Sequence, residues 1–332
     1  MRLSILDQSP IVRGHDARRA IEETLALARR ADELGYYRYW LAEHHAIAAL
    51  ADPCPEMLVA RLGAETKKLR IGTGGVLLPY YSAFRTAESF RMLEALYPGR
   101  IDLGIGRAPG GDARTAHAVS GAGFPDASRF PEQVQQLCAH LDGTLPEGHP
   151  FQAVRVQPEV ATRPEVWLLG SSDYSGVLAA ELGLPFSFAH FINPRGGEAV
   201  AQFYRSRFKP GREAKPRVVV CTFAICAETD AEAERLAAPI DLRRLHMALN
   251  IDSPIPTDEE AAQHRYSEEE RAYILAQRAR AVLGSPRTCR REIEAMAARY
   301  GADEMMVLTI TGSYETRRRS YELLMDAFAK PN

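Results

Sequence analysis

Short apolar runs alternate with amphipathic stretches about eight times along this chain of 332 residues. Runs of this length predict strands, and apolar residues at helical spacing between them predict helices. Val218–Cys226 is almost uninterrupted in its apolar character, as in a parallel strand covered on both faces. The alternation predicts one (β/α)₈ barrel domain, a TIM barrel, over residues 1–332. The predicted strands are Leu3–Leu6, Tyr37–Glu43, two strands within Arg70–Asp112, Val166–Leu169, Phe186–Ile192, Val218–Cys226 and Met305–Ile310.

The gap between the predicted seventh and eighth strands is wider than the others and predicts a helical insertion over residues 240–285. Helices are expected around Ala231–Leu249 and Glu268–Val282, with the polar, proline-containing segment Asp252–His264 between them. A long loop on the working face of a barrel is usually either a lid or a disordered linker. The insertion is therefore a candidate lid.

Charge and cysteine content exclude several classes of protein. Lys and Arg total 41 and Asp and Glu total 43, which argues against nucleic acid or an anionic membrane as the main partner. The five cysteines contain no C-x-x-C pair, so neither a disulfide framework nor a zinc site is indicated. No apolar run is long enough to span a bilayer, and the chain enters the strand-like Leu3–Leu6 directly. We expect a reduced, cytoplasmic protein.

In a (β/α)₈ barrel the active site lies at the C-terminal ends of the strands. Polar residues and glycines gather at those predicted ends, so they form one constellation in space rather than scattered positions. They are Ser9, Glu43, His44, His45, Gly74, Gly75, Arg107, Ser171, Ser172 and His190.

Glycines mark the ends of two of these strands, at Gly74-Gly75 and at Gly104 and Gly106. Glycine weakens a strand, so its presence suggests that something approaches the backbone closely. Arg107 follows directly, where a guanidinium could bind a phosphate. We interpret the segment as the site of a flat, phosphorylated cofactor. Packing glycines beside a surface ion pair are the alternative.

Two serines and a pair of histidines extend the constellation. Ser172 and Ser175 lie where a helix begins, so their hydroxyls and the free backbone N–H groups offer an anion site. A plain helix cap is the alternative. Adjacent His44 and His45 point to opposite sides of the chain, so a shared metal ion would need a further ligand that the sequence does not nominate. One histidine facing the barrel mouth as an acid, base or hydrogen-bond donor is more economical.

Six segments together resemble the bacterial luciferase-like superfamily of flavin-dependent monooxygenases. The resemblance covers nearly the whole chain, and the combination is specific although no single segment is. The segments are W-L-A-E-H-H (Trp40–His45), G-T-G-G-V-L-L-P (Gly72–Pro79), Y-P-G-R-I-D-L-G-I-G-R-A (Tyr97–Ala108), G-S-S-D-Y-S (Gly170–Ser175), G-S-P from Gly284, and A-D-E-M-M-V (Ala302–Val307).

The resemblance implies an enzyme that binds reduced FMN, activates O₂ as a flavin-4a-peroxide and oxygenates a small organic substrate. Gly74-Gly75 matches the position of a non-prolyl cis peptide beneath the flavin ring, and His44 matches a histidine that handles protons. The implied cofactor-binding residues are Gly74, Gly75, Arg107, Arg129, Ser171, Ser172 and Ser175. No metal is implied.

The predicted substrate wall consists of Glu43, Tyr80, Tyr81, Phe188 and His190. Two positions depart from luciferase itself, where a cysteine stands in place of Gly106 and a tryptophan in place of His190. Light emission and a long-chain aldehyde substrate are therefore not expected.

No nicotinamide site is recognisable, so a separate flavin reductase would have to supply the reduced FMN. The resemblance also implies a homodimer. The alternatives are a deazaflavin-dependent hydride transferase on the same barrel, a flavin-binding protein without turnover, and a metal-dependent barrel hydrolase.

Overall fold

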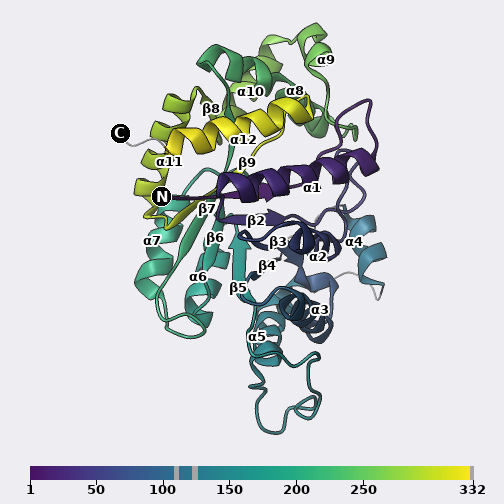
Figure 1. Ribbon diagram of the computed structural model, residues 1–332, viewed down its shortest axis with the longest axis vertical. Helices are drawn as coiled ribbons and strands as arrows, with labels where there is room; N and C mark the ends of the chain where they lie inside the picture. The colour runs from purple at the N-terminus through teal and green to yellow at the C-terminus, as the bar shows by residue number, and fades with distance from the viewer. Residues whose placement is uncertain (108–111, 122–125, 330–332) are drawn as a thin grey trace.

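A computed structural model describes residues 1–107, 112–121 and 126–329 of the protein, so the last residue of the Tyr97–Ala108 motif lies outside it (Figure 1). Within the described residues, eight parallel strands form a barrel that closes through pairing of β6 with β7. The predicted (β/α)₈ barrel is confirmed. The barrel strands are β1 (Arg2–Asp7), β2 (Arg38–Leu41), β3 (Arg70–Leu77), β4 (Ile101–Gly106), β5 (Glu165–Gly170), β6 (Phe186–Ala189), β7 (Val218–Cys226) and β9 (Glu304–Leu308).

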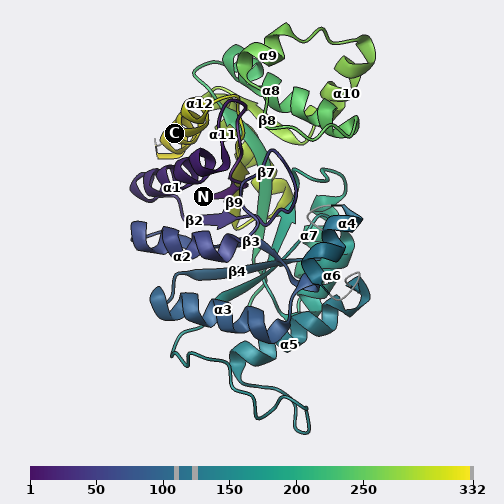
Figure 2. The same cartoon turned by 90° about the vertical axis from the view of Figure 1, so that its right-hand side faces the viewer.

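Helices surround the barrel (Figures 1 and 2). Helix α1 shows how the sequence sets their limits: the carboxylate of Asp16 accepts the N–H of Arg19 at its start, and Gly35 with φ of 86° ends it. The helices around the barrel are α1 (Ala17–Leu34), α2 (Pro55–Glu65), α3 (Ala83–Leu96), α4 (Ala113–Ser120), α5 (Phe130–Asp142), α6 (Asp173–Leu182), α7 (Gly197–Arg207), α11 (Pro286–Tyr300) and α12 (Tyr314–Ala329), with short 3₁₀ turns at Leu78–Tyr80 and Ala127–Arg129.

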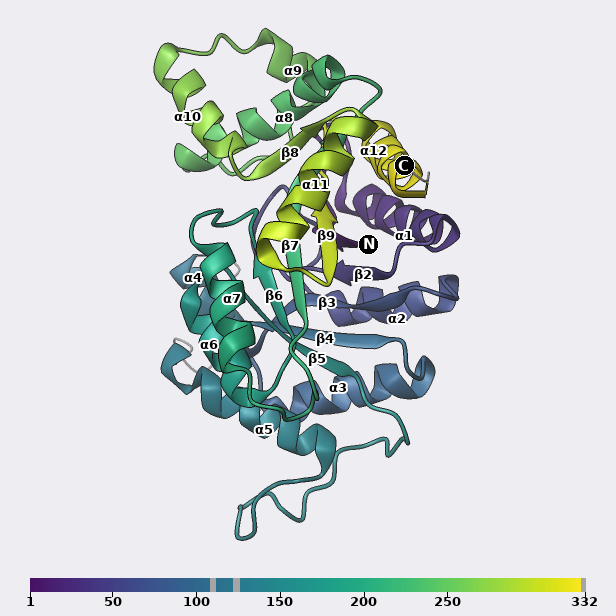
Figure 3. The same cartoon turned by 90° about the vertical axis from the view of Figure 1, so that its left-hand side faces the viewer.

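The segment between β7 and β9 contains helices α8 (Asp230–Ala248), α9 (Asp258–Gln263) and α10 (Glu268–Arg278), which group beside one end of the molecule (Figure 3). The predicted helix to Val282 was wrong at its end, because residues Ala281–Gly284 form a further strand, β8. This strand pairs in parallel with Phe223–Cys226, and of these residues Ala224–Cys226 extend beyond the pairing of β7 with β9.

The insertion is attached to two loops of the barrel. Ile255 donates its N–H to the carbonyl of Ile11 and accepts the N–H of Arg13, both at 2.8 Å. Both carboxylate oxygens of Asp252 accept the N–H of Ala48, at 3.1 and 3.0 Å. These contacts hold residues 252–255 against the loops that follow β1 and β2. A lid function for the insertion stays a prediction.

A buried cluster of charges fills the barrel at the N-terminal ends of its strands. Arg38 on β2 is 1% exposed, and it contacts Asp102 on β4 at 2.7 Å, Glu304 on β9 at 3.0 Å and Glu165 on β5 at 3.2 Å. The guanidinium of Arg38 therefore links β2 to β4, β5 and β9. The carboxylates compensate its charge, which could not otherwise be buried at tolerable cost.

Two indole rings form the next layer. Trp40 and Trp167 pack edge to face with ring centroids 5.5 Å apart. The Trp40 Nε1–H donates to Asp102 at 2.9 Å and the Trp167 Nε1–H donates to Glu165 at 3.1 Å. The guanidinium of Arg38 lies 4.6 Å from the Trp167 ring centroid. The charge cluster thus orients both rings, and their opposite side faces the C-terminal end of the barrel.

Replacing Arg38 with alanine should lower the free energy of unfolding by about 3–5 kcal/mol, because the buried Glu304 would lose its ion pair and Asp102 would keep only Arg70. The control is Arg18→Ala, which breaks an exposed pair with Glu22 on α1 and should cost less than about 0.5 kcal/mol. Urea denaturation measures both. Equal losses in the two variants would contradict the role assigned to the cluster.

Candidate functional site

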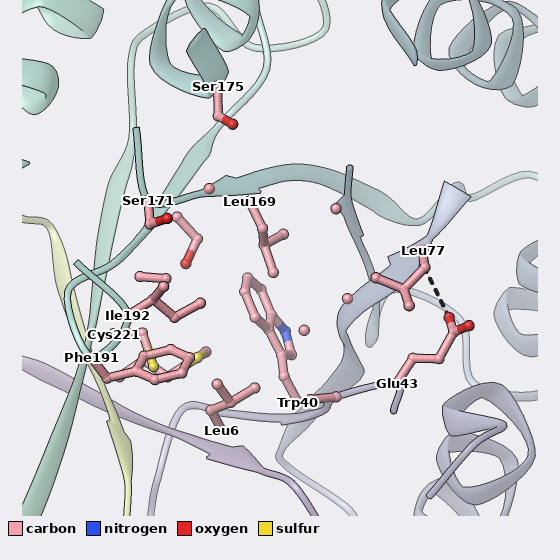
Figure 4. Close-up of a pocket in the computed structure, with 18 of the residues that line it drawn as sticks. Leu6, Trp40, Glu43, Leu77, Leu169, Ser171, Ser175, Phe191, Ile192 and Cys221 are labelled. Carbon is pink, nitrogen blue, oxygen red and sulfur yellow. Dashed lines mark hydrogen bonds between the residues drawn. The ribbon is translucent and has the colours of Figure 1, made fainter. Parts of the chain in front are cut away.

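A cavity of about 390 Å³ lies at the C-terminal ends of the barrel strands (Figure 4). Its size suits a small-molecule ligand, and its position is where (β/α)₈ enzymes place their active sites. The structure brings most of the predicted site residues together in its lining. These are Glu43, His44, Gly74, Gly75, Arg107, Ser171, Ser172 and Ser175.

The peptide bond between Gly74 and Gly75 is cis, and both residues line the cavity. A Cβ on Gly75 would lie 2.6 Å from the carbonyl oxygen of Gly104, and one on Gly74 would lie 2.7 Å from Cδ1 of Leu6. The close approach inferred from sequence therefore comes, at these two positions, from the barrel itself. Their missing side chains are required by neighbouring strands, whatever ligand lies against them.

Alanine substitutions at Gly75 and Gly106 distinguish a glycine that neighbouring strands require from one that they do not. Gly75→Ala should lower the free energy of unfolding by about 1–3 kcal/mol, because the carbonyl of Gly104 is backbone and yields little. At Gly106 the nearest atom to an added Cβ, Leu77 Cδ2, is 3.9 Å away. Gly106→Ala should therefore change stability by less than about 0.5 kcal/mol. Thermal unfolding of both variants measures this difference, and a costly Gly106→Ala would contradict it.

Three serines lie at the end of β5 and the start of α6. Ser172 is the N-cap of α6, yet its side chain makes no capping hydrogen bond, so its hydroxyl is available together with the first N–H groups of the helix other than that of Tyr174. Ser175 lies directly against Gly170, where a Cβ would come within 2.1 Å of its hydroxyl oxygen. Asp173 turns its carboxylate back to the N–H of Tyr174 at 2.9 Å. The arrangement is an open helix N-terminus, which favours an anion.

Arg107 at the end of β4 lies on the same rim. Its guanidinium is centred 4.1 Å from the Tyr174 ring, and within the described residues no carboxylate pairs with it. The surface ion pair considered from sequence is therefore not observed in that part of the chain. Arg107 brings a positive charge to the cavity beside the start of α6.

Arg129 does not join this rim. It ends the 3₁₀ turn Ala127–Arg129, its side chain is exposed, and it lies 3.5 Å from the carboxylate of Glu132 one turn further along. The structure does not place it among the described residues that line the cavity.

Glu43 joins the ends of β2 and β3. Its buried carboxylate accepts the N–H of Leu77 at 2.9 Å (Figure 4), the hydroxyl of Tyr81 at 2.7 Å, and lies 2.7 Å from Nε2 of His45. Burial, together with this carboxylate, raises the pKa of Tyr81. Tyr80 lies beside His45, with ring centroids 6.2 Å apart. Tyr80 and Tyr81, predicted as substrate contacts, thus stand behind the described cavity wall and support it.

His44 faces the cavity while His45 turns toward Glu43, as expected for adjacent residues at a strand end. Burial lowers the pKa of His44 to about 4, so its imidazole is neutral at pH 7. Its Nδ1 is buried and has no hydrogen-bond partner among the described residues. A neutral ring can accept a proton or orient a hydroxyl. Within the same residues, no group of three or more His, Cys, Asp or Glu is arranged to hold a metal ion.

Phe188 and His190 do not reach the cavity. Ser187 and Ala189 on β6 line it, so the alternation of side chains along a strand directs Phe188 outward. There it packs on Tyr300 with ring centroids 5.6 Å apart, and Nδ1 of His190 lies 2.8 Å from the same tyrosine hydroxyl. The substrate contacts predicted for these two residues are therefore not supported.

Sequence reasoning missed most of the apolar lining of the cavity. Apolar side chains do not point to any particular chemistry in a sequence. Only the alternation of side chains along each strand could have indicated which of these residues face inward. They include Leu6, Trp40, Leu169, Phe191, Ile192, Cys221 and Met306.

A buried carboxyl group lies in the loop that carries His44. The carbonyl of Asp52 accepts the N–H of His44 at 3.1 Å, and its Oδ1 accepts the N–H of Cys54 at 3.1 Å. Its Oδ2 is buried without a partner among the described residues. Burial raises the pKa of Asp52 to about 7, and neighbouring carboxylates add to the shift.

Because the pKa of Asp52 is higher in the folded than in the unfolded chain, stability should fall as the pH rises from about 4 to 7. Asp52→Asn removes the ionisation, so the variant should be more stable than the parent at pH 8 by roughly 2–4 kcal/mol. The difference should vanish below pH 4, where both states hold the proton. Urea denaturation across this range measures it, and a pH-independent difference would contradict the assignment.

Residues 1–304 match the family model for luciferase-like monooxygenases. The Bacillus subtilis protein YwcH is 43% identical over 329 residues, covering 98% of the chain and 99% of YwcH. The N-acetyl-S-alkylcysteine monooxygenase of Bacillus subtilis is 34% identical over 331 residues, covering 98% of both proteins. The crystal structure of apo-MsnO8 has a TM-score of 0.92 and 39% identity, covering 100% of the chain and 99% of MsnO8.

The chain therefore belongs to the luciferase-like monooxygenase family, as its motifs predicted. It is, with that family, a flavin-dependent monooxygenase. Two more distant structures share the fold. One is the oxygenating constituent of a Pseudomonas putida 3,6-diketocamphane monooxygenase in complex with FMN, with a TM-score of 0.70, 20% identity and coverage of 98% of the chain and 96% of that protein. The other is an F420-dependent secondary alcohol dehydrogenase, with a TM-score of 0.71, 13% identity and coverage of 98% of both.

Proposed function

We propose that the protein uses reduced FMN and O₂ to oxygenate a small organic substrate, and that a separate reductase supplies the reduced FMN. The observation that carries the proposal is that Arg107, which has no carboxylate partner among the described residues, lies with the N-terminus of α6 on one rim of the cavity. A phosphate dianion is the ligand that such a combination binds best.

The residues fit FMN in two further respects. The walls beyond the rim are largely apolar, as a planar ring system requires. Gly74-Gly75 presents backbone without side chains along one side of the cavity, where a ring can lie flat. We assign phosphate binding to Arg107, Ser171, Ser172 and Ser175. Bound reduced FMN would supply the electrons that activate O₂.

In this proposal His44 is the cavity-lining side chain that handles protons. Because its imidazole is neutral at pH 7, it acts by accepting a proton or by orienting a hydroxyl, rather than as a standing acid. Glu43 holds the ends of β2 and β3 in place through its three hydrogen-bonding partners. The apolar lining keeps water away from the reaction.

A deazaflavin-dependent hydride transfer is the second candidate, because an F420-dependent dehydrogenase shares the fold. Consumption of O₂ with reduced FMN favours the first function, and anaerobic turnover with reduced deazaflavin favours the second. A flavin-binding protein without turnover would show neither. A homodimer, which the family resemblance implies, and a cytoplasmic location, expected from the sequence, are further proposals. Among the described residues, no helix has the length and apolar character to cross a membrane.

Arg107→Ala should weaken FMN binding roughly tenfold to hundredfold, the effect of one charge-assisted phosphate contact. The matched control is Arg129→Ala, which removes an exposed arginine outside the described cavity lining and should leave the affinity within about twofold. Fluorescence titration of FMN measures both dissociation constants. Equal effects of the two substitutions, or no binding by the parent protein, would overturn the proposed phosphate site.

A further inference from the structure

The cavity is polar where it meets β4, β5 and α6. Over the opposite arc the residues within the strands are apolar, and the polar Gln8, Glu43 and His44 follow the ends of β1 and β2. The polar rim comes from β4, β5 and the start of α6. On the other arc four neighbouring strands, β2, β1, β9 and β7, contribute Trp40, Leu6, Met306 and Cys221. Phe191 packs against the same apolar cluster. Figure 4 shows Leu6, Cys221 and Phe191 together on the side away from Glu43. We call these five residues the deep compartment.

The deep compartment offers no charge to a ligand. Leu6, Cys221 and Met306 are each no more than 3% exposed, and burial raises the pKa of the Cys221 thiol, which stays protonated. Three other ionisable residues occur in the described cavity lining. Arg107 lies on the opposite arc, His44 is neutral, and the Glu43 carboxylate is directed toward Leu77, Tyr81 and His45.

Burying an uncompensated charge in such surroundings is costly, whereas burying apolar surface is favourable. We propose that the deep compartment binds an uncharged, apolar end of the organic substrate, so that any charged group of the substrate stays at the cavity mouth. The substrate class is then a small molecule whose reacting end is neutral. Calling this ligand the substrate rests on the proposed function, but the binding preference does not.

The chain carries its own reporter of this compartment. It has two tryptophans, Trp40 and Trp167, which pack against each other, and Trp40 lines the cavity. Intrinsic fluorescence therefore registers a ligand in the compartment without flavin and without turnover.

The test compares cyclohexanol with cyclohexylammonium, a neutral and a charged ring of the same shape. Each is titrated into flavin-free protein and into protein saturated with oxidised FMN. Cyclohexanol should shift the tryptophan emission in both forms, and cyclohexylammonium should bind at least about tenfold more weakly. From cyclopentanol to cycloheptanol, each added methylene should tighten binding about fourfold.

Equal binding of the two rings, or no emission change with any of the alcohols, would overturn the inference. Loss of alcohol binding on saturation with FMN would assign the compartment to the flavin ring and would also overturn it. Alcohol binding in a protein that does not bind FMN would instead refute the proposed function and leave the compartment's preference standing.

Two substitutions locate the bound ring. Met306→Ala enlarges the compartment and should favour cycloheptanol over cyclopentanol more strongly than in the parent. The matched control, Met247→Ala, removes a side chain that is 59% exposed and should change nothing. Cys221→Leu fills the compartment and should abolish cycloheptanol binding with FMN affinity retained, which keeps the test decisive if Met306→Ala fails to fold. Unchanged alcohol selectivity in either folded compartment variant would contradict the placement.

Discussion

The ion cluster around Arg38 is the constraint on which the rest of the barrel depends. A guanidinium at 1% exposure is tolerated only because carboxylates from β4, β5 and β9 meet it inside the barrel. The same carboxylates accept the N–H groups of Trp40 and Trp167. The charges thereby fix the positions of both indole rings, and one of these rings, Trp40, lines the cavity.

The order of elements follows from the sequence because strand and helix periodicities differ and parallel strands need crossover helices. The end of α10 could not be predicted from the sequence, because residues Ala281–Gly284 form a strand by pairing with β7. The rim residues could be predicted, since polar groups at strand ends point to an active site. Two site predictions could not be made reliably from the sequence. Whether Phe188 faces the cavity depends on which alternate residues of β6 point inward, and the position of Arg129 depends on the path of a loop.

The two arcs of the barrel divide the tasks of the site. The arc of β4, β5 and α6 supplies positive charge and hydrogen-bond donors, whereas the arc from β2 to β7 supplies an uncharged surface. Such a division lets one cavity hold an anionic tail and an apolar partner without placing either in the wrong surroundings. The glycines at Gly74-Gly75 lie on β3, between the two arcs.

The contacts that attach the insertion also hold the loop that carries His44. Asp252 holds the backbone of Ala48, in the same loop that carries His44, and Ile255 extends the loop after β1 as a short ladder. Lifting the insertion would therefore pull directly on the segment that presents the imidazole. The position of residues 252–255 and the position of the loop that carries His44 are therefore mechanically linked.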